Sequence, residues 1–368
     1  MTRLAELADP PIPDLLESDV EGDLRATVRD LLDKRAAWPD VLARTESDEP
    51  VDSALWAALG EIGCAGLPVP VASGGAGASW AEATVVAEEL GRRVASVPFL
   101  GHSMAVAALV ALGEAALLPA LASGERTGVL AVPFASSPGR IGPVAADGAV
   151  DSVADAWVAE VLLLFAGSGA GATLWAVEAG AVDRRAVVSL DMTRPLVDLR
   201  SVEAGQVLAK GAAAQHAVDH ALRIGAVLLA AEQVGLANRG LEMTVEYVSS
   251  RRQFARVVGS YQALKHRMAD LWVALTQARA AARYAAVCAA TGAADLAVAA
   301  ALAQARCSPV AARAAEECIQ LHGGIGFTWE HPAHLYLKRA VSDSIALGTA
   351  ERHRAILADL LDLPGPMR

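Results

Sequence analysis

Apolar residues recur at three- and four-residue steps through residues 213–368, a period typical of helices that pack on one side. One such face lies between residues 264 and 275, and another lies within the segment 214–249. The first comprises Leu264, Met268, Leu271 and Leu275, and the second comprises Ile224, Val227, Leu228, Ala231 and Val234. Farther along, Ser308-Pro309 predicts either a kink in one helix or a new helix that Ser308 caps.

The remainder of the chain shows two other patterns. Residues 1–125 alternate helical runs with short segments rich in Pro and Gly, such as 60–80. Residues 126–212 contain short apolar runs separated by Gly, Pro, Asp and Ser, which is typical of strands and turns. The predicted strands lie in VLAVPFA (129–135), WVAEVLLLFAG (157–167) and AVVSLDM (186–192). We therefore predict a mostly α fold with a small β domain: an α-helical domain at 1–125, a β domain at 126–212 and a helical bundle at 213–368.

Composition supports this architecture and narrows the function. Hydrophobic residues make up 54% of the chain but aromatic residues only 4%, which favours closely packed helices over a β-rich core. The formal net charge of −11 argues against nucleic acid or an anionic membrane as the main partner. An anionic ligand therefore requires a local basic cluster that works against the overall charge.

Cysteine usage and the apolar stretches predict a reduced, cytoplasmic protein. The cysteines show no spacing typical of a zinc site and are interpreted as buried thiols; they are Cys64, Cys288, Cys307 and Cys318. No basic segment leads into an apolar core near Met1, so we expect no secretory signal. The most apolar stretch, 96–124, contains two prolines and Glu114, which predicts a buried helix rather than a membrane span.

A basic segment follows the long helical pattern that ends near residue 250. Its arginines are Arg251, Arg252 and Arg256, and Lys265, His266 and Arg267 come soon after. One interpretation is a solvated face that complements a helix C-terminus. The other is a phosphate site, because guanidinium groups bind phosphate oxygens in pairs.

A glycine-rich segment, QLHGGIGF (320–327), follows the next Ala-rich helix. Gly323 and Gly324 are consistent with simple helix termination. Three glycines within four residues exceed what termination needs, and they let a backbone approach a bulky anion. His322 is interpreted as a structural histidine in preference to a general acid or a ligand.

These segments resemble the acyl-CoA dehydrogenase family. The resemblance is carried by LAAEQVGLANRGLEMTVEYVSSRRQFARVVGSYQALKHRMADL (229–271), by QLHGGIGFTWEHPAHLYLKRA (320–340) and by GEIGCAGLPVP (60–70) with GGAGASWAEATVVAEELGR (74–92). It implies an N-terminal helical domain, a middle β domain and a C-terminal four-helix bundle, with FAD lying across a subunit interface. The positions implied to hold the adenine and diphosphate half of a neighbouring subunit's FAD are Arg251, Gln253, Phe254, Gln262, Gln320, Gly323 and Gly324. Ala255 departs from the glycine usual there, and its methyl group is expected to crowd the loop.

Other features of that family are missing. The region 128–167 lacks the run similar to TEPGAGSD and the hydroxyl and amide neighbours that a flavin ring needs beside Trp157. The usual position of the catalytic glutamate is Leu347, and the alternative position falls at Gly225. Neither side chain can accept a proton. Glu232 is the one substitute worth naming, and a structural pairing within the bundle is the preferred interpretation of it.

The resemblance therefore implies a subunit that lends FAD contacts to a partner and lacks a base of its own. The predicted assembly is α2β2 or αβ with a homologous chain that carries the glutamate, and it oxidises an acyl-CoA, including steroid side-chain substrates, to a 2,3-enoyl-CoA. Two alternatives stay open. One is a self-sufficient homo-oligomeric acyl-CoA dehydrogenase with an unrecognised base, and the other is a non-catalytic scaffold protein of the same fold.

Overall fold

The computed structural model describes residues 14–142, 144, 149–200 and 205–363. Its N-terminal part is helical, and the order along the chain is α1 (Asp19–Arg35), α2 (Trp38–Thr45), α3 (Ser53–Glu61), α4 (Trp80–Arg93), α5 (Phe99–Leu112) and α6 (Leu118–Ala122). Capping boxes begin α1 and α4, where Ser18 and Ser79 pair with Glu21 and Glu82. The apolar stretch 96–124 forms α5, which is buried almost throughout, and α6. This burial agrees with the prediction of a buried helix in this stretch.

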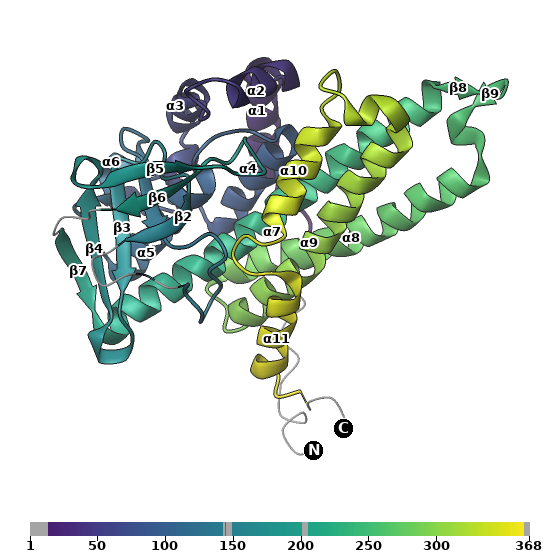
Figure 1. Ribbon diagram of the computed structural model, residues 1–368. Helices are drawn as coiled ribbons and strands as arrows, with labels where there is room; N and C mark the ends of the chain where they lie inside the picture. Colours follow the sequence, from purple (N-terminus) through teal and green to yellow (C-terminus); the bar gives the residue numbers. More distant parts are fainter. Residues whose placement is uncertain (1–13, 143, 145–148, 201–204, 364–368) are drawn as a thin grey trace.

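Two small sheets follow α6 (Figure 1). Their strands are β1 (Gly128–Ala131), β2 (Val150–Ala154), β3 (Val161–Ala166), β4 (Thr173–Glu178), β5 (Asp183–Val187), β6 (Leu196–Arg200) and β7 (Gln206–Lys210). One sheet has the order β1-β3-β4-β7 and the other β2-β6-β5. Because side chains alternate along a strand, Leu162 and Leu164 face the second sheet while Leu163 and Phe165 join the helical core.

The predicted strand positions need correction in two places. Trp157 lies in the turn between β2 and β3, and β3 starts at Val161, so the prediction that a strand runs through Trp157 is wrong. The run 186–192 contributes only the end of β5, which stops at Val187. Asp191, farther along the same run, is buried in an ion cluster instead. Short apolar runs therefore predicted which segments form strands better than they predicted where each strand begins and ends.

The C-terminal part is a helical bundle that consists of α7 (Gly211–Ser250), α8 (Gln262–Thr291), α9 (Leu296–His322), α10 (Ala333–Asp343) and α11 (Ala350–Leu360). All five apolar residues predicted on one face of α7 are buried, and α7 contacts α4, α5, α8 and α9. Gly91 and Gly235 let the backbones of α4 and α7 touch, because a Cβ at Gly235 would lie 1.9 Å from the Glu88 carbonyl oxygen.

The helix α9 runs without a break through Pro309. The alternative of a new helix capped by Ser308 is therefore wrong, since Ser308 lies inside the helix with its side chain buried. Among the described helices, α7 alone has the length and apolar character to cross a bilayer, but 89% of its apolar window is buried inside the fold. This burial marks α7 as the central helix of the core.

Candidate functional site

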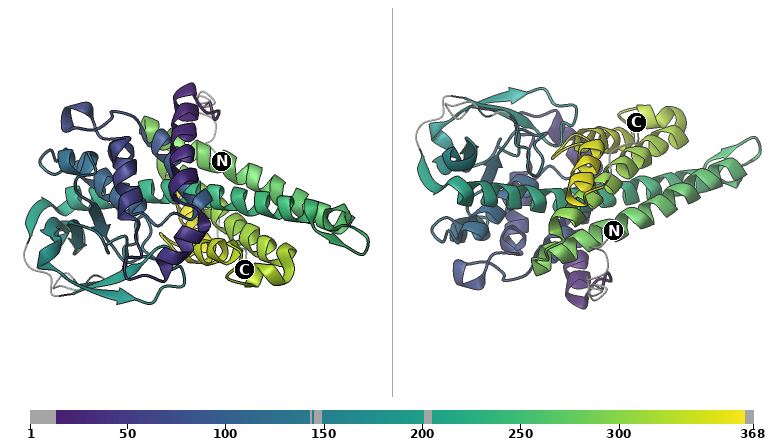
Figure 2. Two further views of the ribbon diagram at one scale, coloured as in Figure 1. Left: turned by 90° about the horizontal axis from the view of Figure 1, so that it is seen from above. Right: turned by 90° about the horizontal axis from the view of Figure 1, so that it is seen from below.

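The long helices α7 and α8 extend beyond the rest of the molecule and are joined at their tip by a hairpin (Figures 1 and 2). The hairpin pairs β8 (Arg252–Gln253) with β9 (Arg256–Val257). Its central residues, Phe254 and Ala255, have φ angles of 49° and 62°. Such two-residue hairpins need φ > 0 at both positions, which favours Asn or Gly. Ala255 is therefore unfavourable because of its left-handed backbone.

The glycine-rich segment lies at the end of α9 and forms a short 3-10 turn, η6 (Gly323–Phe327). Gly323 has φ 62° and ψ −139°, a conformation that side chains other than glycine avoid. A Cβ added at Gly324 would meet nothing within 4 Å, and its φ is not positive. Packing within this chain therefore gives no reason for glycine at 324, and the open space above it leaves room for an external group.

The two segments face each other across a groove of about 640 Å³. Among the residues predicted to hold FAD, those that line this groove are Arg251, Gln253, Gln320, Gly323 and Gly324. Phe254 instead lies at the hairpin tip with 86% of its surface exposed, and Gln262 begins α8. The structure thus brings five predicted residues together and places the other two beside them.

The basic residues near this groove have different roles. The guanidinium of Arg251 lines the groove and makes no hydrogen bond or ion pair with any described residue. Arg267 also lines it but pairs with Glu317 at 2.7 Å. Arg256 stacks on the Tyr261 ring at 3.7 Å, and Arg252 turns back to the Ala255 carbonyl. Arg251 is therefore the cation of the hairpin that is open to an anionic ligand.

His322 is structural, as the sequence indicated. It is buried, and its Nδ1 lies 2.6 Å from the Cys318 carbonyl oxygen, to which it can donate. Its ring stacks on Tyr247 and lies tilted against His331, with centroid distances of 4.5 and 4.3 Å. Burial lowers the pKa of His322, and the hydrogen bond to Cys318 opposes that change only in part. The stack fixes the floor of the groove.

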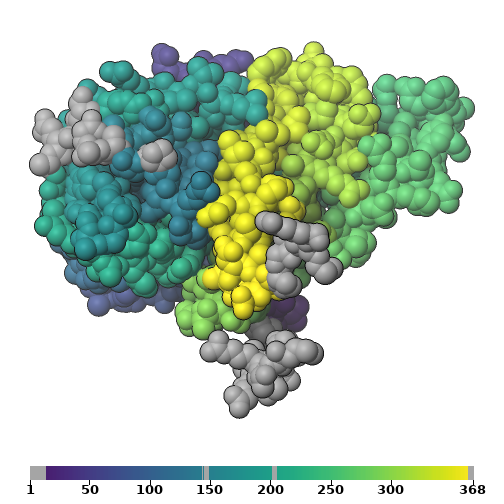
Figure 3. Space-filling view, turned by 60° about the horizontal axis from the view of Figure 1, so that its bottom comes forward, coloured from purple at the N-terminus to yellow at the C-terminus, as the bar shows by residue number. Residues whose placement is uncertain are grey.

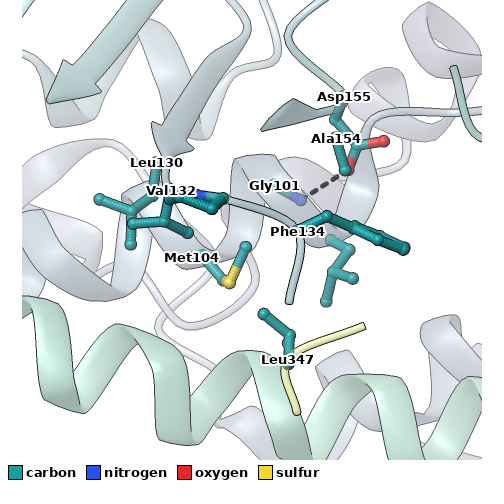
Figure 4. Close-up of a pocket in the computed structure, with 10 residues that line it drawn as sticks. Gly101, Met104, Leu130, Val132, Phe134, Ala154, Asp155 and Leu347 are labelled. Atoms are coloured by element: carbon teal, nitrogen blue, oxygen red, sulfur yellow. Dashed lines mark hydrogen bonds between the residues drawn. The ribbon is translucent and has the colours of Figure 1, made fainter. Parts of the chain in front are cut away.

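A second cavity lies where β1, β2, α5 and the turn after α10 meet, and most of the residues that line it are buried (Figure 4). Its volume is about 20 Å³, room for roughly one water molecule. Met104 and Leu347 extend toward each other above α7 (Figure 4). A Cβ at Gly225 would lie 2.5 Å from the Met104 sulfur and 3.0 Å from Leu347 Cδ1. The two positions predicted for a base, Leu347 and Gly225, thus converge on one spot, which apolar atoms fill.

Asp155, which sequence reasoning missed, is the carboxyl of this cavity. It is buried, its Oδ2 accepts a 2.7 Å hydrogen bond from the Gly101 backbone N–H, and its φ is 62°. Burial raises the pKa of Asp155 despite the nearby positive charge of Arg194. A left-handed Asp in the turn after β2 has no distinctive sequence pattern, so no motif could have found it.

Glu232 belongs to a buried ion cluster rather than to a reaction site. Arg194 and Arg339 each bond it at 2.6 Å, and they also bond Asp343 and Asp191 respectively. Burial opposes ionisation of Glu232, but the two guanidiniums outweigh it and lower its pKa. A carboxylate held this way is a poor base, so the preferred interpretation of Glu232 as a structural residue is consistent with its surroundings.

Solved structures share this architecture over nearly the whole chain. The ChsE4–ChsE5 complex from Mycobacterium tuberculosis superposes with a TM-score of 0.85 at 25% identity, covering 96% of this chain and 100% of that one. A variant of the steroid ACAD Tcur3481–Tcur3483 gives a TM-score of 0.81 at 28% identity and covers 93% of this chain and 98% of that one. The chain therefore has the helix–sheet–bundle architecture of these solved structures.

Sequence comparison gives the family. The acyl-CoA dehydrogenase N-terminal domain matches residues 18–125, and the acyl-CoA dehydrogenase C-terminal domain matches residues 215–361. The acyl-CoA dehydrogenase IpdE2 of Mycobacterium tuberculosis (strain ATCC 25618 / H37Rv) is 39% identical over 320 residues, which is 86% of this chain and 89% of that protein. The chain belongs to the acyl-CoA dehydrogenase family, whose members oxidise acyl-CoA with FAD. The resemblance and the predicted fold are confirmed.

The residues present fit one half of FAD. The groove offers an unpaired guanidinium and glycine backbone open to a diphosphate, which suits the nucleotide half. The inner cavity of about 20 Å³ does not fit a flavin ring together with a thioester, since ligand sites usually need about 300 Å³ or more.

Proposed function

We propose that this chain is the nucleotide-lending subunit of a heteromeric, FAD-dependent acyl-CoA dehydrogenase. A homologous partner supplies the flavin-ring pocket and the catalytic glutamate. One observation carries the proposal: the groove at the hairpin is open while the inner cavity is filled by Met104 and Leu347. The expected assembly is α2β2 in the cytoplasm, with one FAD per heterodimer. The chain alone is expected to be inactive.

The chemistry divides between the chains accordingly. FAD, when bound, accepts the hydride that leaves the β-carbon of the acyl-CoA. Arg251 neutralises part of the diphosphate charge, and the Gly323–Gly324 backbone lies against it without side-chain hindrance. Phe254, exposed at the projecting tip, packs against the adenine end. In the described part of the chain, the two positions predicted for a base, Leu347 and Gly225, offer no atom that can accept the α-proton.

The substrate class follows from the relatives. Tcur3481–Tcur3483 is named a steroid ACAD, and ChsE4–ChsE5 is a complex of two chains. We extend both properties to this chain, and the expected substrate is a bulky acyl-CoA such as a steroid side-chain thioester. The product is the 2,3-enoyl-CoA.

Co-expression with a homologous chain that carries the glutamate tests the proposal. The measurement is FAD per heterodimer, from the absorbance of flavin released by denaturation. Arg251→Ala should weaken FAD binding by about 2 kcal/mol, or about thirtyfold in Kd, because it removes one charge-assisted contact. Arg252→Ala is the matched control, because Arg252 is adjacent and equally charged but bonds the Ala255 carbonyl. Equal flavin content in the two variants would contradict the lending role.

Gly324→Ala gives a second test that does not change charge. The open space at Gly324 predicts normal folding and a normal unfolding midpoint, with reduced flavin content in the complex. A complex that stays colourless with every homologous partner would favour a scaffold protein over a dehydrogenase subunit.

Asp155 favours a second candidate, a self-sufficient dehydrogenase with an unusual base. It is a buried carboxyl of raised pKa that lines the inner cavity. Under this alternative the chain purified alone is yellow, reduces an acceptor dye with acyl-CoA, and loses that activity in Asp155→Asn. Under the proposed function the isolated chain is colourless and Asp155→Asn changes no activity.

A further inference from the structure

Two arginines line the groove at the hairpin, but one of them is already neutralised by a carboxylate. The arginines are Arg251 and Arg267. Arg267 Nη2 lies 2.7 Å from Glu317 Oε2, and Arg267 Nε donates to Glu317 Oε1 at 3.3 Å. Arg267 belongs to the second turn of α8 and Glu317 to the end of α9, so their ion pair joins the two helices. The projecting hairpin, in green, lies beside the end of α9, in yellow-green (Figure 3).

The ion pair is costly to open. The side chain of Glu317 is only 15% exposed, its Oε2 is buried, and its partner among the described residues is Arg267. If Arg267 turned to a ligand, Glu317 would keep an uncompensated charge in a largely buried place, which is strongly destabilising. The pair is therefore expected to persist when an anion enters the groove.

The groove then offers an entering anion a single uncompensated cation. The guanidinium of Arg251 has no partner among the described residues. His322 also lines the groove, but burial lowers its pKa, so its ring is neutral near pH 7. The remaining donors are neutral, namely the amides of Gln253 and Gln320 and the backbone at 323–324. The carboxylate of the Arg267 pair is thus a source of repulsion that the groove does not offset.

Nucleotides differ in how strongly that carboxylate would repel them. A free terminal phosphate carries about 1.5 to 2 negative charges near pH 7, because its second ionisation has a pKa of about 6. A phosphate that is esterified on both sides lacks this second ionisation and carries less charge. Since electrostatic repulsion grows with the charge of the ligand, the carboxylate disfavours a free terminal phosphate more than an esterified one.

We propose that Glu317, acting through Arg267, makes the groove select a diphosphate diester, the form present in FAD, over nucleotides that end in a free phosphate, such as ADP. Glu317 is a positioning residue, because it holds Arg267 away from the phosphates of the ligand. Selectivity of this kind comes from a group that repels the wrong ligand as well as from groups that attract the right one. The inference rests on the proposed function, since it concerns the nucleotide site of the heteromeric complex.

Displacement of FAD from the co-expressed complex by ADP and by ADP-ribose tests this selectivity. The two competitors share the adenosine diphosphate, but the terminal phosphate of ADP-ribose is esterified. ADP-ribose should therefore displace FAD from the parent complex at a lower concentration than ADP does. Glu317→Gln should narrow the ratio of the two half-displacement concentrations by about threefold or more, because it frees Arg267 to bind the terminal phosphate. The fluorescence of the released flavin measures displacement.

Three other variants control this test. Glu316→Gln removes the same charge one position away on α9, where Glu316 is exposed and pairs with no described residue, and it should leave the ratio unchanged. Glu317→Asp keeps the carboxylate and should retain the parent ratio. Arg267→Gln leaves the carboxylate uncompensated and should widen the ratio. This opposite change tests the inference even if Glu317→Gln does not fold.

An unchanged ratio in both Glu317→Gln and Arg267→Gln, or an equal narrowing in Glu316→Gln, would overturn the inference. So would a parent complex that ADP and ADP-ribose displace to the same extent, including not at all. If Arg251→Ala lowers the flavin content while the ratio stays the same in every variant, the proposed function stands and only the selectivity role of Glu317 is wrong. A complex that holds no flavin contradicts both.

Discussion

Restoring a carboxylate at Leu347 tests whether the inner cavity is closed to catalysis or lacks only its base. Leu347 is 3% exposed and packs on Met104 beside Gly225 in a cavity of about 20 Å³. A glutamate buried there among apolar groups is expected to stay protonated. Holding it neutral at pH 7 costs about 3.7 kcal/mol, from an ordinary pKa of about 4.3 and about 1.36 kcal/mol per pH unit.

The pH dependence identifies this cost. The folded-state pKa of the new glutamate is raised, so the folded chain keeps a proton that the unfolded chain loses above about pH 4.3. The stability deficit therefore shrinks as the pH falls, from about 3.7 kcal/mol at pH 7 to about 1 kcal/mol at pH 5. Urea unfolding of Leu347→Glu at both pH values measures it, and Leu347→Gln, which has similar size and no charge to lose, is the control.

The same variant tests catalysis. Because the cavity has no room for a flavin ring and thioester, Leu347→Glu should reduce no dye with acyl-CoA when purified alone. Acyl-CoA-dependent dye reduction by the isolated variant would refute the reasoning. So would a deficit relative to Leu347→Gln that is the same at both pH values, since it would show an ionised, solvated carboxylate.

Three further predictions concern the scaffold. Ala255→Gly should stabilise the hairpin locally by about 0.5–1 kcal/mol, because Ala255 has a left-handed backbone that glycine adopts without strain. Hydrogen exchange of the hairpin amides should therefore be slower, and exchange as fast as in the parent chain would contradict this. Arg339→Met should lower the free energy of unfolding in urea by about 3–5 kcal/mol, because it leaves buried carboxylates without their counter-charge. Arg354→Gln removes an exposed ion pair and should lower it by about 1 kcal/mol or less. Similar losses in the two variants would contradict the structural role of the buried ion cluster. Burial raises the pKa of Asp343 to about 8 despite Arg194, so the folded state holds a proton that the unfolded state releases, and stability falls as pH rises from about 4 to about 8. Asp343→Asn should remove this decline, so the stability of the variant relative to the parent chain should increase as the pH rises. Parallel pH profiles of stability for the two proteins would contradict the raised pKa.

Local patterns predicted the parts of the site that are local in sequence. The faces of α7 and α8 followed from helical periodicity, and Arg251 and Gly323 lie close to helix ends, where their residue types point to an anion. The segments 250–262 and 320–327 are far apart along the chain. The resemblance predicted that both hold one cofactor, and the groove shows that they meet.

Features made by distant residues were beyond such reasoning. Arg194 and Asp343 are separated by 149 positions, and no pattern at either residue indicates the other. The filling of the inner cavity by Met104 depends on how α5 lies against α7, and Asp155 depends on an unusual backbone angle. Trp157 was misplaced because an apolar run looks alike in a strand and in the turn that precedes it.

The buried ion cluster also has a consequence for how the chain is made. Arg194 comes from the loop before β6, Glu232 from α7, and Arg339 and Asp343 from α10, close to the C-terminus. Until α10 has emerged from the ribosome, Glu232 lacks the counter-charge of Arg339. Closing the surface between the sheets and α7 before then would bury a carboxylate that is only partly paired. We therefore expect nascent chains that stop before α10 to remain open and protease-sensitive, and this surface to close only once α10 has been made.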